Sequence, residues 1–316
     1  MADGKWIDGL YVEMPVAEAA RLVLAARFAV VRTYLPLAVE TPYADREYIH
    51  QLRVGTRRCR AAIEVFRDCL PKKDVKEAKA ALRSIRRAAG AARDWDVFIE
   101  SLESARPLKS ASGKPTLDFL LGYALGERSA AQARLVEAAE RTGPEFLELS
   151  AALPEHLREP RETHFESFGA LALADLHLGI EEFQLGVDAD PTEPADLHKL
   201  RILGKRLRYS IEIFAPCFSP SLKDQIYPAV EALQEHLGEL QDAAVGIECL
   251  ERLRDMARQT IPTEWPRLRS GITKLIQAMR TKLRSGRRKF QQWRKHWGKV
   301  VAEYPLEPGE RGASAP

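Results

Sequence analysis

Residues 50–66 read HQLRVGTRRCRAAIEVF, and this stretch decides the fold. A helix advances by about 100° per residue, so side chains three and four positions apart share a face. The polar stripe of such a helix is formed by His50, Arg53, Arg57, Arg60 and Glu64. A roughly opposite, apolar stripe is formed by Leu52, Cys59, Ile63 and Phe66. The pattern predicts a helix over about 45–69 that buries its apolar stripe and holds something negative with its aligned arginines.

The same arrangement returns at residues 198–214, which read HKLRILGKRLRYSIEIF. The repeat is ungapped at an offset of 148 residues. Identical pairs are His50/His198, Leu52/Leu200, Arg53/Arg201, Arg58/Arg206, Arg60/Arg208, Ile63/Ile211, Glu64/Glu212 and Phe66/Phe214. Arg57 corresponds to Lys205, which keeps the charge. The following helices match in the same register at Gly90/Gly238, Asp94/Asp242 and Val97/Val245. This recurrence predicts two helical units related by duplication.

Helical periodicity continues through the rest of the chain, and no alternation typical of strands extends over a useful length. We expect helices at about 15–39, 45–69, 71–105 and 116–141, with Thr142-Gly143-Pro144 closing the first unit. The second unit is expected to contain helices at about 161–185, 194–215, 220–259 and 264–298. The sequence therefore predicts an all-α chain of two tandem four-helix-bundle repeats, with a pseudo-two-fold relation between them. Their predicted bounds are 10–143 and 161–300, with a linker at 144–160 and a disordered tail at 301–316.

Charge is strongly segregated along the chain, although the formal net charge is only +3. Residues 46–93 contain fourteen lysines and arginines against five acids, and residues 267–299 contain twelve against none. Local fields of this sign attract polyanions or acidic surfaces. The apolar and charged fractions, 45% and 29%, are typical of a soluble globular protein.

The cysteines and the N-terminal region favour a cytoplasmic location. None of the cysteines belongs to a CxxC pair, and they stand at Cys59, Cys69, Cys217 and Cys249. We expect reduced, mostly buried thiols rather than a disulfide framework or a zinc ribbon. We expect no signal peptide. The most apolar stretch, Leu22–Leu37, contains Arg27 and Arg32, so we do not expect it to span a membrane.

The repeated motifs resemble those of the CHAD family, the conserved-histidine α-helical domain. The family signature of His, Arg at +3, Arg or Lys at +7 and Arg at +10 is met at 50–60 and at 198–208. Its companion element, Leu-Gly followed by Asp, appears as Leu237-Gly238…Asp242, and with alanine in place of leucine as Ala89-Gly90…Asp94. The resemblance covers about residues 10–300. It implies paired helical bundles that bind inorganic polyphosphate along a basic central groove or pore, in some members at polyphosphate granules.

The chemistry of the basic stripes suits such a ligand. Arginine offers a planar fork for two oxygens, and lysine supplies a compact charge. From residue 50 to residue 60 a helix rises about 15 Å, enough to follow several phosphate units. The predicted polyphosphate-binding residues are His50, Arg53, Arg57, Arg58 and Arg60, their counterparts His198, Arg201, Lys205, Arg206 and Arg208, a stripe on the next helix of Lys76, Lys79, Arg83, Arg86 and Arg93, and Lys282 and Arg288 of the last helix.

Several of these assignments have a structural alternative. His50 and His198 could bind the ligand or fix helix packing. Arg58 and Arg206, about 100° away from the main stripe, could lie on a solvated or ion-paired surface. The acids are expected to be structural partners of basic groups, with Glu64 and Glu212 orienting the arginines four residues before them and with Asp94 and Asp242 in a similar role.

Other function classes fit the sequence less well. Nucleic-acid binding or an acidic-protein scaffold would use the same charges, but aromatic interleaving and helix-turn-helix, RRM and zinc-finger signatures are absent. Glu47-Tyr48-Ile49-His50 fits a di-iron motif, yet the second copy has Ala195 in place of the glutamate, and arginines would repel a cation. No acid–base or nucleophilic constellation stands out. We therefore expect a non-catalytic polyanion-binding protein without cofactor or metal, located in the cytoplasm, with polyphosphate granules as the expected place of association. Phosphate processing or metal-dependent catalysis is the remote alternative, and the sequence leaves the oligomeric state open.

Overall fold

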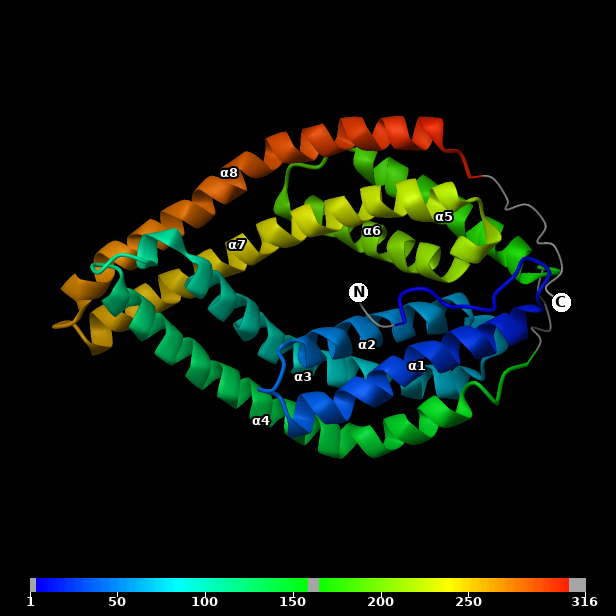
Figure 1. The fold of residues 1–316 in the computed structure, drawn as a ribbon, viewed down its shortest axis with the longest axis horizontal. Helices are drawn as coiled ribbons and strands as arrows, with labels where there is room; N and C mark the ends of the chain where they lie inside the picture. Colours follow the sequence, from blue (N-terminus) through cyan, green and yellow to red (C-terminus); the bar gives the residue numbers. More distant parts are fainter. Residues whose placement is uncertain (1–3, 159–164, 307–316) are drawn as a thin grey trace.

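The apolar periodicities of the chain become eight helices in the computed structural model, which describes residues 4–158 and 165–306 (Figure 1). The helices are α1 Val16–Glu40, α2 Glu47–Val65, α3 Lys72–Ser104, α4 Lys114–Ala152, α5 Phe168–Asp188, α6 Pro194–Phe214, α7 Tyr227–Thr260 and α8 Trp265–Glu303. No strand occurs within the described ranges. The prediction of an all-α chain is therefore confirmed.

Helix α4 is longer than the sequence predicted. Gly143 and Pro144 lie inside it, so the prediction that they close the first unit was wrong. A proline inside a helix removes one backbone hydrogen bond. Burial offsets this loss, because Phe146 is fully buried and its ring packs edge-on against Phe28 at a centroid distance of 6.0 Å. The stretch 144–160, expected to be a linker, thus begins as the last turns of α4, which ends at Ala152.

Other helix ends differ more modestly. Helix α5 starts at Phe168 instead of 161, and the expected start of this helix lies partly outside the described residues, which omit 159–164. A short π-helical turn, Leu222–Ile226, precedes α7. Helix α8 continues to Glu303, into the stretch expected to be disordered, and 307–316 lie outside the described part of the chain. The remaining domain boundaries stay predictions.

The helices pack in two groups that follow the repeats, α1–α4 and α5–α8, and one large core joins the groups. At its centre Phe168 stacks on Phe66, with ring centroids 6.3 Å apart, and contacts Phe214 in a tilted arrangement at 5.3 Å. Phe66 and Phe214 are equivalent positions of the two repeats, and all three rings are almost fully buried. Burying a phenylalanine stabilises the fold by roughly 1.5–3 kcal/mol, so this cluster holds the repeats together at one end.

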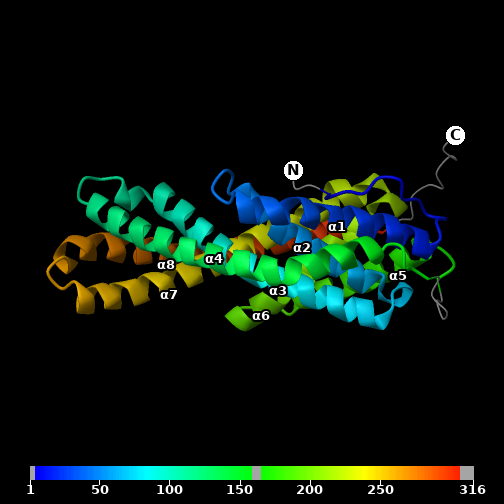
Figure 2. The ribbon, with the colours of Figure 1, turned by 90° about the horizontal axis from the view of Figure 1, so that it is seen from below.

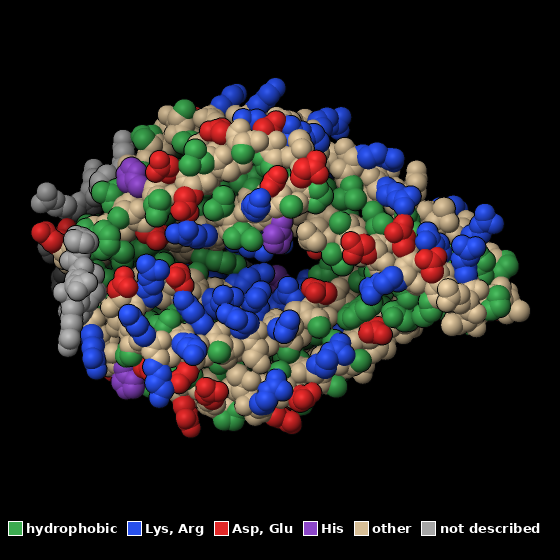
Figure 3. Space-filling view, turned by 180° about the vertical axis from the view of Figure 1, so that it is seen from behind, with side chains coloured by type: hydrophobic (Ala, Val, Ile, Leu, Met, Phe, Trp, Pro, Cys, Tyr) green, Lys and Arg blue, Asp and Glu red, His purple; other side chains and the backbone are tan. Residues whose placement is uncertain are grey.

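A second core closes the far end of the molecule. The α3–α4 and α7–α8 hairpins project beyond the main core, and their tips meet (Figures 1 and 2). Their contact is apolar and includes Leu102, Leu120, Leu250 and Ile272. The helices approach closely at Gly271, where a Cβ atom would lie 2.3 Å from Thr116 Oγ1. Between the two cores the surface is hollowed, and Lys and Arg side chains gather there (Figure 3).

Helix α1 belongs to the main core. By length and composition it is the one described helix that could cross a membrane, a test that a buried helix of a soluble protein also passes. It packs against α2 and α4, and most of its apolar side chains are fully buried, among them Val23, Leu24 and Phe28. The arginine expected to interrupt this stretch, Arg27, is buried as well.

Candidate functional site

Helices α2 and α3 line a basic cavity of about 630 Å³, here called the central cavity. Its lining consists of Arg53, Arg57, Arg83, Arg86, Arg87, Gly90, Ala91 and Asp94. Five of these eight residues are arginines and one is an acid. The helical spacing of three and four residues places the arginines of each helix on one face, as the sequence predicted for α2. The cavity is therefore an electropositive site with many hydrogen-bond donors.

Arg53 is held in place by α3. Its Nη1 donates to the carbonyl oxygen of Gly90 at 2.7 Å and to Asp94 Oδ1 at 3.2 Å. Gly90 permits this approach, because a Cβ there would lie 3.1 Å from Arg53 Nη1. Burial lowers the pKa of Arg53, while Asp94 raises it and Arg57 lowers it further. Asp94 itself is 71% exposed, so it orients the guanidinium without enclosing it.

Helix α6 brings the second repeat to the same cluster. Burial lowers the pKa of Arg201, with Asp242 acting in the opposite direction and Arg57 adding to the decrease. Burial also lowers the pKa of Lys205 to about 7, and the cations that add to this shift are Arg201, Arg57, Arg53 and Arg208. Two cations lower each other's pKa in this way when their side chains lie close together. Cations of α2 and α6 thus form one cluster, and the two helices are in contact.

Several arginines of this cluster keep donors that are buried and unsatisfied. Within the described part of the chain, no hydrogen-bond partner is found for the Nε atoms of Arg57, Arg60, Arg86, Arg201 and Arg208. Burial, then Arg86 and Arg83, lowers the pKa of Arg60. An unpaired buried donor or charge is costly, and a neighbouring anion removes this cost. The arrangement is suited to binding an extended anion.

The two repeated histidines lie in different environments. His50 is half-buried, and its pKa is lowered mainly by burial; Glu47 opposes this shift, and Arg93, Arg57 and Arg53 add to it. His198 is exposed and borders a second, mostly apolar cavity of about 310 Å³ between α6, α7 and α8. Arg201 also borders that cavity. The repeat therefore does not give the histidines equal roles.

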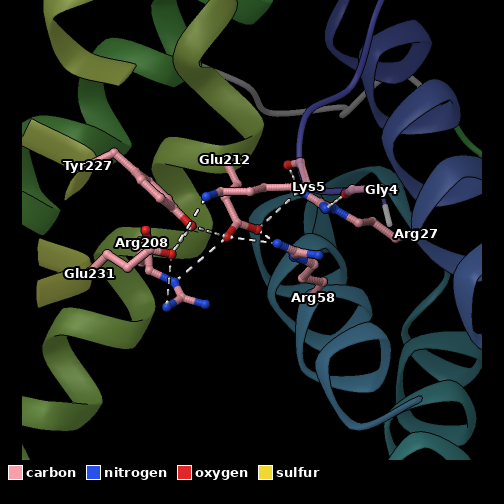
Figure 4. Close-up of polar contacts among 8 residues, drawn as sticks. All are labelled: Gly4, Lys5, Arg27, Arg58, Arg208, Glu212, Tyr227 and Glu231. Atoms are coloured by element: carbon pink, nitrogen blue, oxygen red, sulfur yellow. Dashed lines mark hydrogen bonds and ion pairs between the residues drawn. The ribbon is translucent and has the colours of Figure 1, made fainter. Parts of the chain in front are cut away.

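Arg58 lies in a buried polar network and does not line the central cavity (Figure 4). Its Nε and Nη2 donate to the Glu212 carboxylate at 2.6 and 3.1 Å. Tyr227 Oη donates to the same carboxylate at 2.8 Å, and Arg27 Nη2 lies 3.6 Å from it. Burial and Glu212 raise the pKa of Tyr227. Glu212 was expected to orient Arg208, but its Oε1 lies 3.7 Å from Arg208 Nε, beyond hydrogen-bond distance. Its main partner is Arg58.

Other predicted residues form surface ion pairs. Glu64 contacts Lys79 and Arg67, so the expectation that it orients Arg60 was wrong. The remaining pairs are Arg206 with Glu182 at 2.8 Å, Arg93 with Glu100 at 3.0 Å and Lys282 with Glu239 at 3.5 Å. Lys76 and Arg288 are exposed.

Sequence reasoning missed Arg87, which lines the central cavity. Its position four residues after Arg83 is a helical spacing that could have revealed it. Asp242, expected to be a structural partner of basic groups, lies near Arg201 of the cluster. Burial raises its pKa, Arg201 opposes this shift, and Asp94 adds to it. Among the described residues, no group of three or more His, Cys, Asp and Glu side chains could hold a metal ion.

Comparisons with known proteins place this geometry in a family context. The family model described as CHAD domain matches residues 22–251. The fold is similar to the crystal structure of the CHAD domain from the plant Ricinus communis, with a TM-score of 0.74, 22% identity and coverage of 95% of this chain and 96% of that chain. It is also similar to PptA from Streptomyces chartreusis, with a TM-score of 0.64, 18% identity and coverage of 89% and 99%. No curated protein matches the chain.

Proposed function

Because the chain belongs to the CHAD family, we propose that its central cavity binds inorganic polyphosphate. The observation that carries this proposal is the lining of the cavity by five arginines of α2 and α3, of which Arg57 and Arg86 have buried Nε atoms without a hydrogen-bond partner among the described residues. Lys205 has its pKa lowered to about 7 by burial and by arginines that include Arg57 and Arg53 of the other repeat. An anion bound in the cavity lies near these cations of both repeats, so it relieves their repulsion and stabilises the charged form of Lys205.

The chemistry of the cavity favours a chain of phosphates over a nucleic acid. Each phosphate unit presents oxygens to arginine forks and offers no base edge to read. Within the described part of the chain, the lining of the central cavity contains no aromatic side chain on which a base could stack.

We propose that binding is not accompanied by hydrolysis, and that it takes place in the cytoplasm at polyphosphate granules. The four cysteines are buried thiols, which suits a reducing compartment. Incubation with long-chain polyphosphate should release no orthophosphate above the protein-free control. A fluorescently tagged chain should coincide with stained granules in cells that make them.

Calorimetric titration with linear polyphosphates of defined length tests the binding proposal. Replacing Arg57 and Lys205 by alanine should weaken binding by about tenfold or more, since hydrogen bonds to charged groups contribute roughly 1.5–3 kcal/mol each. Arg206→Ala is the matched control, because Arg206 is exposed and paired with Glu182. Unchanged affinity in the double variant, or displacement of polyphosphate by duplex DNA at equal phosphate concentration, would contradict the proposal.

A further inference from the structure

The outward face of α8 forms a ridge of cations separate from the central cavity. Arg284, Arg288, Lys295 and Lys299 are all exposed, and we call them the α8 ridge. The helical period places them within an arc of about 60°, and they extend over about 22 Å of helix. Neighbouring charges along the ridge are about 6–10 Å apart, within a Debye length at physiological salt, so their fields add.

The ridge cations differ from the other basic residues of α8. Several of the other basic residues of α8 form ion pairs with acids of neighbouring elements, such as Arg280 with Glu251 and Arg287 with Asp190. Within residues 4–158 and 165–306, no ion pair is found for the four ridge residues. Arg284 donates to Thr281 Oγ1, a neutral partner. The charge of the ridge is therefore free to act on a ligand.

The ridge points away from the central cavity. The buried side of α8 carries Phe290, Trp293 and Trp297, which pack against α5 and α7. Helices α7 and α6 lie between α8 and the cations of α2. In the space-filling view, Lys and Arg side chains follow the outer edge formed by α8, apart from those gathered in the central hollow (Figure 3). A short anion cannot contact both places at once.

We propose that the α8 ridge is a second phosphate-chain site, which makes the protein bivalent for polyphosphate; this inference rests on the proposed function. The face suits a polyanion recognised by charge alone. Among the described residues, no large hydrophobic side chain of α8 is exposed, so the ridge offers neither a platform for bases nor an anchor for a membrane. Arginine and lysine on a regular spacing can follow a flexible phosphate chain.

Bivalency has a consequence that one site alone does not give. Protein molecules with one site each bind along a long polyphosphate chain without linking it to another chain, and the chain stays soluble. A protein with two sites on opposite sides of a wall of helices links one chain to another and builds a network. The ridge would thus convert binding into cross-linking of chains.

Charge reversal of the ridge tests this proposal in the full chain. The ridge variant carries Arg284→Glu, Arg288→Glu, Lys295→Glu and Lys299→Glu. The matched control carries Lys72→Glu, Lys109→Glu, Lys114→Glu and Arg134→Glu, which are exposed positions with the same change of net charge. A third variant, Arg53→Ala with Arg57→Ala, weakens the central cavity. If circular dichroism shows that the four glutamate substitutions unfold the helix, a variant with glutamine at the same four positions is used instead.

Two measurements decide the outcome. Calorimetry with a short linear polyphosphate should give two sites in the unchanged chain and in the matched control, and one site in the ridge variant. Light scattering with long-chain polyphosphate should rise for the first two proteins and stay at baseline for the ridge variant. Two sites and full scattering in the ridge variant would overturn the assignment of a second site to the α8 ridge and leave the central cavity untouched. Loss of binding in the ridge variant for duplex DNA or anionic vesicles, but not for polyphosphate, would also overturn it. Unchanged short-chain binding in the third variant would instead overturn the proposed function.

Discussion

Arg58 and Glu212 are 154 residues apart in the sequence and form a buried two-point ion pair between α2 and α6. They belong to different repeats, and neither is one of the aligned cations of its motif. Arg58 is 2% exposed and Glu212 is fully buried, so neither is available to a ligand. The pair fixes how the cation stripes of the two repeats face each other.

Removing one partner of this pair should destabilise the fold strongly. Glu212→Gln removes the buried carboxylate that Arg58 and Arg27 share, and breaking a buried pair costs about 3–5 kcal/mol. Urea unfolding followed by circular dichroism measures this change. Arg206→Ala, at the position equivalent to Arg58, should cost less than about 1 kcal/mol because it breaks an exposed pair. Equal losses for the two variants would contradict a structural role for the Arg58–Glu212 pair.

Gly90→Ala should weaken polyphosphate binding several-fold without loss of helix. The added Cβ would lie 3.1 Å from Arg53 Nη1 and would push the guanidinium off the carbonyl oxygen of residue 90. Gly238→Ala is the matched control, because the corresponding contact with Arg201 Nη2 is 3.9 Å. Both changes raise helix propensity by about 1 kcal/mol, so stability alone cannot separate them. Calorimetric titration of both variants checks the prediction, and equal affinities would refute it.

Binding should take up protons near neutral pH. The pKa of Lys205 is about 7 in the free protein, and a bound polyanion should raise it towards the ordinary lysine value, because the anion favours the ammonium form. Affinity for polyphosphate should therefore fall as the pH rises from below 7 towards the ordinary pKa of lysine. Titrations in buffers of different ionisation enthalpy measure the proton uptake. Lys205→Arg should bind with little pH dependence in this range, and an unchanged pH profile would exclude Lys205 as the titrating group.

Affinity should fall steeply with salt. The logarithm of the binding constant should decrease linearly with the logarithm of salt concentration, by about 0.7 for each phosphate contact of a single-stranded polyanion. Arg57→Ala should reduce the magnitude of that slope by about this amount, whereas Arg206→Ala should leave it unchanged. Fluorescence anisotropy with a labelled polyphosphate at several salt concentrations measures the slopes. A flat dependence would exclude multiple phosphate contacts.

The sequence predicted the helices and the cation stripe because both depend on local periodicity. Apolar residues three and four apart define each buried face, and Arg53 and Arg57 follow the same period. The offset of 148 residues then identified Arg201 and Lys205 as their counterparts in the second repeat. The structure brings these four residues into one cluster of interacting charges.

Other features depend on contacts between distant segments, which carry no local signal. The spacing of Arg58 shows that it leaves the main stripe, but it does not reveal the acid of the other repeat that binds it. Pro144 has the local character of a helix end, and only the burial of Phe146 explains why α4 continues. Arg87 could have been predicted from its spacing after Arg83. The pairing of Glu64 with Lys79, instead of Arg60, depends on how α3 packs beside α2.

The apolar contact between the hairpin tips has a kinetic consequence. With Gly271 against Thr116 at one end and the phenylalanine cluster at the other, the helices surround the hollow between the two cores (Figure 3). A linear polyphosphate bound in this hollow, as proposed, would enter by a free end and leave by sliding along its own axis. Its dwell time then grows with its length even when the number of phosphates in contact stays constant. A cyclic phosphate of the same charge has no end to insert and would be admitted only when the tips part.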